Sequence, residues 1–182
     1  MGFQRRPEKP VLFVGTLFSR LDVYEGALPV LKANFGSILY ASPFLPWDHS
    51  DYYAGELGAP ICRSFVFFET VIDPAFLVEA KLISHDIEKT FSLDGRRQIN
   101  IDPGYVTLAK VVLSSKKNYS HRIYLGKGVY GELELFYKDG RFNPLPYTYY
   151  DYRDDTVLPI FLKARDLLKG ILKAGEDKRL SA

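Results

Sequence analysis

Residues 63–74 read RSFVFFETVIDP, and this stretch decides the class of fold. The run Arg63–Glu69 is short and rich in aromatic and apolar residues, which is typical of a buried strand. Asp73 and Pro74 follow closely, and this pair indicates a helix start, because aspartate caps free N–H groups and proline fits the first turn. The stretch therefore predicts a strand that leads into a helix.

The segments on either side extend this alternation of strands and helices. Upstream, Val11–Leu17 predicts a first strand, a helix follows that ends at Gly36, and Ser37–Ala41 predicts a second strand. Downstream of the helix that begins at Asp73, Arg97–Asp102 predicts a fourth strand. The order βαββαβ is the ferredoxin-like pattern.

The remaining segments extend this core. Residues 42–60 hold three prolines and two glycines, which predicts a long irregular connection. We expect a short helix over Val106–Ser115, a β-hairpin over His121–Tyr137 and a final helix over about Thr156–Lys173. The predicted fold class is α+β, with a ferredoxin-like core extended by a C-terminal β-hairpin region and a final helix.

Length and composition favour one domain over residues 1–182, with residues 1–9 and 175–182 as flexible tails. The net charge of +2 is too small to indicate a dedicated nucleic-acid-binding protein. Cys62 is the only cysteine, which excludes an intrachain disulfide and a cysteine-rich zinc site. Because no leader pattern and no apolar run of roughly 20 residues is present, we expect a cytoplasmic protein without membrane insertion. The oligomeric state stays open.

The strongest candidate for a site is the run 100–107, NIDPGYVT. Asn100 and Asp102 point to the same side of a strand, because side chains alternate between its two faces. Pro103 and Gly104 predict a turn, and the helix expected after it would offer free N–H groups to an anion such as phosphate. Asp102 is thus a candidate acid or base and Asn100 a candidate ligand contact. The alternative is that Asp102 only caps the turn.

Basic and aromatic residues nearby complete the candidate set. Lys110 and Lys117 would share a polar face of the expected helix, Arg122 could hold phosphate, and Tyr105 could orient a ligand. His121 could donate a proton near neutral pH. However, alternation places His121 on an apolar strand face, which favours a hydrogen-bonded core histidine, and the lysines could simply face solvent.

Two further segments contribute one candidate each. Residues 126–131 read GKGVYG and bring in Lys127, but a glycine pattern between antiparallel strands favours a hairpin turn over a nucleotide loop. Residues 147–153 read YTYYDYR, and Tyr149 could orient a ligand there. The same segment could equally be a strap that packs the final helix onto the sheet.

No cofactor can be assigned from the pattern of ligand types. The three histidines lie far apart in sequence, so no metal is predicted from them. An oxygen-only Mg²⁺ site that combines Asp102 with Glu132 or Asp151 is possible, although the spacing gives it no support.

Taken together, residues 100–110 (NIDPGYVTLAK), 121–128 (HRIYLGKG) and 144–149 (PLPYTY) resemble the prokaryotic family catalogued as domain of unknown function 4416. The resemblance covers nearly the whole chain. It implies a single domain, and it brings no activity, cofactor or site residue with it.

From the residues, the leading functional hypothesis is a domain that binds or acts on a phosphate-containing ligand, such as a nucleotide, a phosphorylated metabolite or an RNA end. The alternative is a non-enzymatic protein-interaction module or a homo-oligomeric structural protein. RNA binding by an aromatic sheet face is disfavoured, because both faces of Phe65–Phe68 are expected to be buried.

Overall fold

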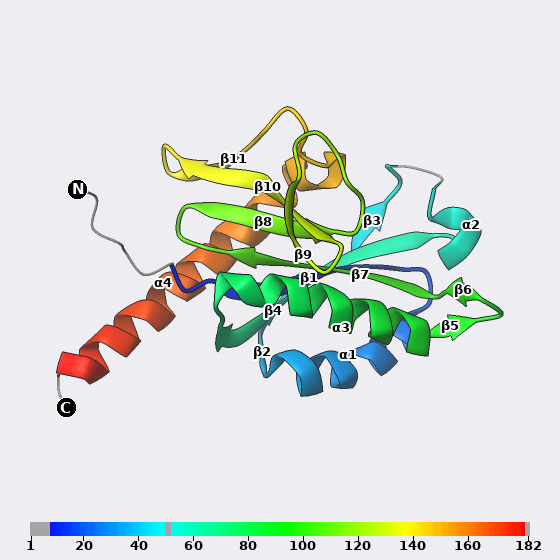
Figure 1. Ribbon diagram of the computed structural model, residues 1–182, viewed down its shortest axis with the longest axis horizontal. Coiled ribbons are helices and arrows are strands. Elements are labelled where there is room, and N and C mark those ends of the chain that lie inside the picture. The colour runs from blue at the N-terminus through cyan, green and yellow to red at the C-terminus, as the bar shows by residue number, and fades with distance from the viewer. Residues whose placement is uncertain (1–7, 50–51, 181–182) are drawn as a thin grey trace.

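The computed structural model describes residues 8–49 and 52–180 (Figure 1). They form a mixed α/β structure with one large antiparallel sheet and four helices. The strands of the large sheet are β1 (Val11–Phe18), β2 (Ile38–Ala41), β3 (Leu45–Trp47), β4 (Ile61–Val71), β7 (Ile99–Val106), β8 (Lys110–Ser115), β9 (Ile123–Gly126), β10 (Val129–Lys138) and β11 (Arg141–Pro144). The helices are α1 (Leu21–Phe35), α2 (Ala54–Leu57), α3 (Leu77–Thr90) and α4 (Leu158–Leu180).

Short elements complete the described residues. A small second sheet pairs β5 (Ser92–Leu93) with β6 (Arg96–Arg97). Single helical turns, η1 (Pro74–Phe76) and η2 (Tyr150–Arg153), precede α3 and α4. The large sheet has the order β11-β10-β8-β7-β1-β4-β2, while β3 also pairs with β4 and β9 with β10.

Helices cover both faces of this sheet, α4 on one face and α1 with α3 on the other (Figure 1). Because side chains alternate along a strand, neighbouring residues of β4 enter different cores. Phe65 packs against Phe161 of α4, whereas Val66 belongs to the cluster that holds Leu31 of α1 and Ala80 of α3. The expected burial of both faces at Phe65–Phe68 is confirmed, since all four side chains are fully buried.

Several predicted elements are confirmed. The strands around Val11–Leu17, Ser37–Ala41 and Arg63–Glu69, the His121–Tyr137 hairpin and the final helix are all present. Asp73 accepts a hydrogen bond from the Ala75 N–H at 2.8 Å, as a residue capping a helical turn does.

The prediction of a helix over Val106–Ser115 was wrong, because Lys110–Ser115 is strand β8. Val111 and Leu113 are buried two residues apart, which is strand spacing. The strand pairs with β10 on one side and with β7 on the other, so its backbone groups are satisfied without a helix.

The prediction of a turn at Pro103 and Gly104 was also wrong, because both residues lie inside β7. Gly104 is needed there for close packing. A Cβ at this position would lie 2.5 Å from both Phe13 Cζ and the Val112 carbonyl oxygen, closer than atoms can approach.

Two other regions differ from the sequence-based expectation. Residues 42–60 were predicted to be irregular, but β3 and α2 lie within them. Helix α4 extends through residues 175–180, which were expected to form part of a tail. Of the predicted tails, residues 1–7 and 181–182 lie outside the described residues. Within the described part of the chain, no helix has the length and apolar character needed to cross a membrane.

Candidate functional site

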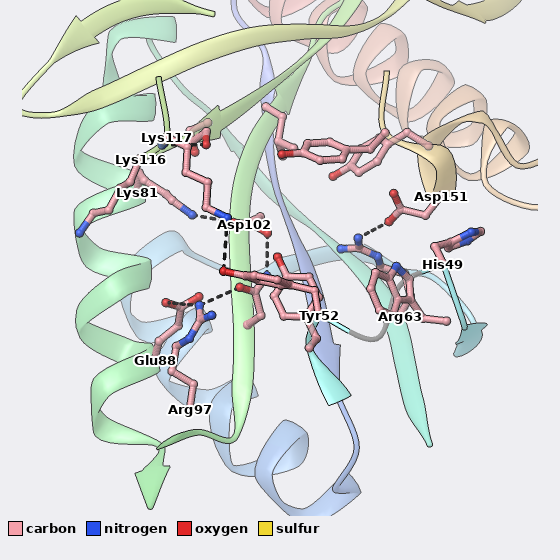
Figure 2. A pocket seen from close by; sticks show the side chains of 18 of the residues that line it. His49, Tyr52, Arg63, Lys81, Glu88, Arg97, Asp102, Lys116, Lys117 and Asp151 are labelled. Carbon is pink, nitrogen blue, oxygen red and sulfur yellow. Dashed lines mark hydrogen bonds and ion pairs between the residues drawn. The ribbon is translucent and has the colours of Figure 1, made fainter. Parts of the chain in front are cut away.

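A cavity of about 420 Å³ lies where β7 and β8 diverge (Figure 2). These two strands pair only between residues 104–106 and 111–113, so the first half of β7 and the end of β8 separate. Helix α3 borders the opening, and Glu88 of α3 accepts a hydrogen bond from the Ile101 N–H at 2.6 Å. The cavity therefore lies at an opening between strands whose exposed backbone is partly satisfied by a side chain.

The strand register explains why polar residues gather on one face of the sheet. Leu17 of β1 lies between Asn100 and Arg63, and Gly15 lies opposite Asp102. These residues therefore share one face. Trp47 joins them, because Leu45, two residues earlier, pairs with Arg63. This is also the face that α4 covers farther along the strands.

Asp102 is held on both of its oxygens. Lys81 Nζ donates to Oδ1 at 2.6 Å, and Asn100 Nδ2 donates to Oδ2 at 2.6 Å. Burial acts to raise the pKa of Asp102, but the Lys81 charge and the two hydrogen bonds outweigh it and hold this pKa below its ordinary value. Asp102 is therefore a charged group at neutral pH, oriented by its neighbours.

Arg97 and Glu88 form a second polar group beside it. Arg97 Nη1 lies 3.3 Å from Glu88 Oε2 and donates to Asn100 Oδ1 at 2.9 Å. Arg97 also donates twice to Glu56, each at 2.7 Å. Burial raises the pKa of the Glu88 carboxyl. This network ties α2, α3 and β7 together at the edge of the cavity.

The opposite side of the cavity holds a buried ion pair between Arg63 and Asp151 (Figure 2). Arg63 Nη2 donates to Asp151, but Arg63 Nε and Nη1 have no hydrogen-bond partner among the described residues. The same holds for Trp47 Nε1 and for the hydroxyl of Tyr152, whose side chain is fully buried. Buried donors normally have partners, so four unpaired donor atoms from three lining residues are unusual.

The charge of the cavity is positive. Among its described lining residues, five lysines and arginines face three carboxylates. Each carboxylate is paired with one cation, Asp102 with Lys81, Asp151 with Arg63 and Glu88 with Arg97. Lys116 and Lys117 therefore remain as the surplus.

These two lysines directly follow β8, which ends at Ser115. Lys117 Nζ lies 4.7 Å from the centre of the Tyr52 ring and 3.4 Å from its hydroxyl. Burial, together with the positive charges of Lys81 and Lys89, lowers the pKa of Lys116. An anion at this position would relieve that repulsion.

Residues 8–167 match the family described as Domain of unknown function (DUF4416). The chain belongs to this family. No curated protein and no solved structure matches the chain.

In this DUF4416 chain, four of the candidate residues line the cavity: Asn100, Asp102, Lys117 and Tyr149. Arg122 lies behind them rather than in the lining. It donates to the Tyr149 hydroxyl at 2.6 Å and to Ser115 Oγ at 2.9 Å, and it lies 3.0 Å from Glu132. Burial acts to lower the pKa of Arg122, but the neighbouring Glu132 carboxylate outweighs burial and raises this pKa. Arg122 is therefore placed to position the lining residues.

The other candidates do not line the cavity of this DUF4416 domain. His121 stacks on Tyr147 with ring centres 4.4 Å apart, and its Nε2 lies 2.8 Å from Glu132. Lys127 sits in the hairpin turn and pairs with Glu79 at 3.1 Å. Two more lie on strands away from the cavity, the exposed Lys110 and the half-buried Tyr105.

Arg63, Trp47 and Lys81 were not among the predicted site residues, yet all three line the cavity. A signal for Arg63 was present in the sequence, since this charged residue lies two positions before the apolar run Phe65–Phe68 of the predicted strand. Lys81 likewise occurs one turn after the buried Leu77 of α3 and one position after the buried Ala80. A buried cation requires a partner, and such positions point to a site or an ion pair.

The described residues do not support a metal centre. Within residues 8–49 and 52–180, no three histidine, cysteine, aspartate or glutamate side chains are grouped so that they could hold a metal ion. The Mg²⁺ site considered for Asp102 with Glu132 or Asp151 is therefore not assembled, and both Asp102 oxygens are engaged by Lys81 and Asn100.

Proposed function

We propose that the cavity binds a phosphate-containing ligand, such as a nucleotide or the end of an RNA chain. The observation that carries this proposal is the pair of surplus cations, Lys116 and Lys117, at the margin of a cavity whose three carboxylates are already paired. Charge-assisted hydrogen bonds from lysine to phosphate are among the strong polar interactions of proteins.

The remaining polar residues have supporting roles in this proposal. Lys81, held by Asp102, would contribute a third positive charge near the phosphate. Asp102 would act through Lys81 and Asn100 rather than as a free base, since both of its oxygens accept hydrogen bonds. Arg122 would fix the Tyr149 hydroxyl and Ser115 at the cavity wall.

Isothermal titration calorimetry with nucleotides and phosphorylated metabolites tests the proposal. The double variant Lys116→Ala/Lys117→Ala should weaken binding about tenfold or more, since hydrogen bonds to charged groups contribute roughly 1.5–3 kcal/mol. Lys110→Ala is the matched control, because Lys110 is an exposed lysine of β8, the strand that precedes Lys116 and Lys117, and does not line the cavity. Absence of binding by the wild type, or an equal loss in the control, would contradict the proposal.

A second candidate function is self-association through β9. Its side chains Ile123, Tyr124 and Leu125 are exposed, and among the described strands β9 pairs only with β10. An unpaired apolar edge favours pairing with the same strand of a second copy. Light scattering should then give a dimer mass that Ile123→Lys reduces to that of a monomer, whereas a wild-type monomer would remove this candidate.

We also propose that β7-β1-β4-β2, with α1 and α3 on one face, form a ferredoxin-like core. The antiparallel order of these strands supports this, as does the connection of β1 to β2 through α1 and of β4 to β7 through α3. The strands β8, β10 and β11 then extend the sheet beyond that core.

A further inference from the structure

We infer that the part of the cavity around Arg63, Trp47 and Tyr152 takes a planar ring that carries carbonyl oxygens. The ligand would then be a nucleotide with an oxo-bearing base, such as uracil or hypoxanthine. This inference rests on the proposed function, because Lys116 and Lys117 are required to hold the phosphate of the same molecule.

The first argument is the supply of unused donors. Arg63 Nε and Nη1, Trp47 Nε1 and the Tyr152 hydroxyl are all buried without a hydrogen-bond partner in the described part of the chain. All three residues line the cavity. Arginine and tryptophan nitrogens can only donate, so a group that satisfies them must bring acceptors. A buried donor left unpaired is costly, and a ligand that pairs it recovers that free energy.

The second argument concerns charge. The Arg63 guanidinium already forms an ion pair with Asp151, and Asp102 also acts on it through its charge. A second anionic group placed here would meet two carboxylates and only one guanidinium. A carbonyl oxygen is a neutral acceptor that avoids this repulsion and accepts from the same N–H groups, whereas an amino group would bring further donors.

The third argument is the shape and chemistry of the walls. Aromatic rings surround these donors, with Trp47 and Tyr53 in edge-to-face contact at 5.4 Å between ring centres. Tyr149 and Tyr152 line the same cavity. Aromatic side chains stack on bases of any sequence, so the rings favour a planar ligand, while the donors select among planar ligands.

Gly15 leaves room for the side chains of Arg63 and Tyr152 beside the sheet. A Cβ at Gly15 would lie 3.0 Å from Arg63 Nη1 and 3.3 Å from the Tyr152 hydroxyl. A side chain at this position would therefore press on both unpaired donors. Because Gly15 has no side chain, Arg63 and Tyr152 can lie close to the sheet there. Gly15 is paired with Phe65 on one side and with Asp102 on the other.

The experiment compares nucleotides that differ by one group. Wild-type protein is titrated calorimetrically with UMP against CMP and with IMP against AMP, pairs in which an oxo group replaces an amino group. Ribose 5-phosphate serves as the probe without a base. We expect each oxo nucleotide to bind about fivefold or more tightly than its amino partner, the size of about one hydrogen bond.

Two variants remove single donors from the wall. Tyr152→Phe removes a hydroxyl that has no partner within the described residues, and Trp47→Phe removes the indole N–H, so both variants should fold. Each should weaken UMP binding about fivefold and leave ribose 5-phosphate binding unchanged. Tyr119→Phe, at an exposed tyrosine outside the cavity lining, is the matched control.

The outcomes separate the two proposals. Equal affinity for oxo and amino nucleotides, or for UMP and ribose 5-phosphate, would overturn the base inference and leave phosphate binding intact. Unchanged UMP affinity in Tyr152→Phe and Trp47→Phe would also overturn it. If no phosphorylated compound binds the wild type, both proposals fail.

Discussion

The sheet face that packs against α4 carries different kinds of side chain at its two ends, although the same strands run through both. At one end, Phe13 and Phe65 each contact Phe161 of α4 at 5.1 Å between ring centres. At the other end, Asp102 of β7 and Arg63 of β4 occupy positions of the same face and border a cavity. Gly15, two residues after Phe13 on β1, lies between these ends.

This difference shows how a site can arise on a rigid core without a separate domain. The aromatic end fixes the strands through apolar burial, which is the main favourable term in folding. The polar end then holds Asp102, Asn100 and Arg63 in fixed positions, because the strands that carry them are anchored elsewhere. Positions on strands are more precise than positions on loops.

Loss of the aromatic end should have the largest effect. Phe161→Ala is expected to lower the free energy of unfolding by about 4 kcal/mol, because Phe161 is fully buried and its truncation leaves a cavity among rings. Urea unfolding measures the change. Leu93→Ala, at an exposed side chain, should change it by about 0.5 kcal/mol or less. A loss below about 1 kcal/mol for Phe161→Ala would contradict this description of the core.

The second effect concerns the buried ion pair at the polar end. Arg63→Met should cost about 3 kcal/mol, because it leaves the Asp151 carboxylate without its partner while both side chains are less than a tenth exposed. The double variant Arg63→Met/Asp151→Leu should be more stable than the single variant, since it removes the uncompensated charge. Unfolding curves of the three proteins decide this, and a double variant less stable than Arg63→Met would oppose it.

Apart from the short elements β3, α2, β5 and β6, the sequence indicated the order of helices and strands over the first hundred residues, because apolar runs and the Asp73-Pro74 start are local signals. It did not indicate β8, because Lys110 and Lys117 also fit a helical face. What makes Lys110–Ser115 a strand is pairing on both sides, with β7 and with β10, which comes to lie beside it only when the chain folds. Gly104 was predicted to be a turn residue. A glycine is needed there because the Phe13 ring, which comes from another strand, leaves no room for a side chain.

The candidate site was predicted only in part, because some of its residues come together only through contacts between strands. Asn100 and Asp102 follow from alternation along one strand, and both line the cavity. Arg122 was selected for its charge, but Glu132 and Tyr149 engage it behind the wall. Arg63 and Trp47 reach the site only through the register of β3, β4 and β1, which no local pattern encodes.

The third prediction compares two glutamates of β10 behind the polar end. Glu132 lies near Arg122 and His121, whereas Glu134 is fully buried and has one oxygen without a partner among the described residues. Burial, reinforced by Glu132, raises the pKa of Glu134 to about 8. The folded protein therefore binds this proton more tightly than the unfolded chain does, and stability should fall as the pH rises from about 4.5 to about 8.

Glu134→Gln should remove most of that dependence. At pH 8 the variant is expected to be more stable than the wild type by at least about 2 kcal/mol, and near pH 4.5 the difference should vanish. Glu132→Gln is the control and should instead destabilise, because it weakens the interactions with Arg122 and His121. Urea unfolding at several pH values gives the curves; a wild type whose stability rises over this range would refute the assignment to Glu134.

The smallest expected change in the free energy of unfolding comes from removing the Tyr152 hydroxyl, which lies where the aromatic and polar ends meet. Tyr152→Phe should change the free energy of unfolding by about 0.5 kcal/mol or less, because the ring stays in the aromatic core and the lost hydroxyl has no described partner. Thermal and urea unfolding measure it. A loss above about 1 kcal/mol would mean that the hydroxyl already has a partner in the folded protein.

The most direct test of a ligand site at the polar end uses Trp47, the only tryptophan of the chain. Its indole N–H gives a single resonance in a ¹H–¹⁵N correlation spectrum, and the nitrogen is buried without a partner in the described residues. Titration with UMP should shift this resonance progressively to saturation, and Lys116→Ala/Lys117→Ala should require a higher concentration for the same shift. A resonance that does not move at saturating UMP, or that moves equally with ribose 5-phosphate, would contradict the proposed recognition of the base.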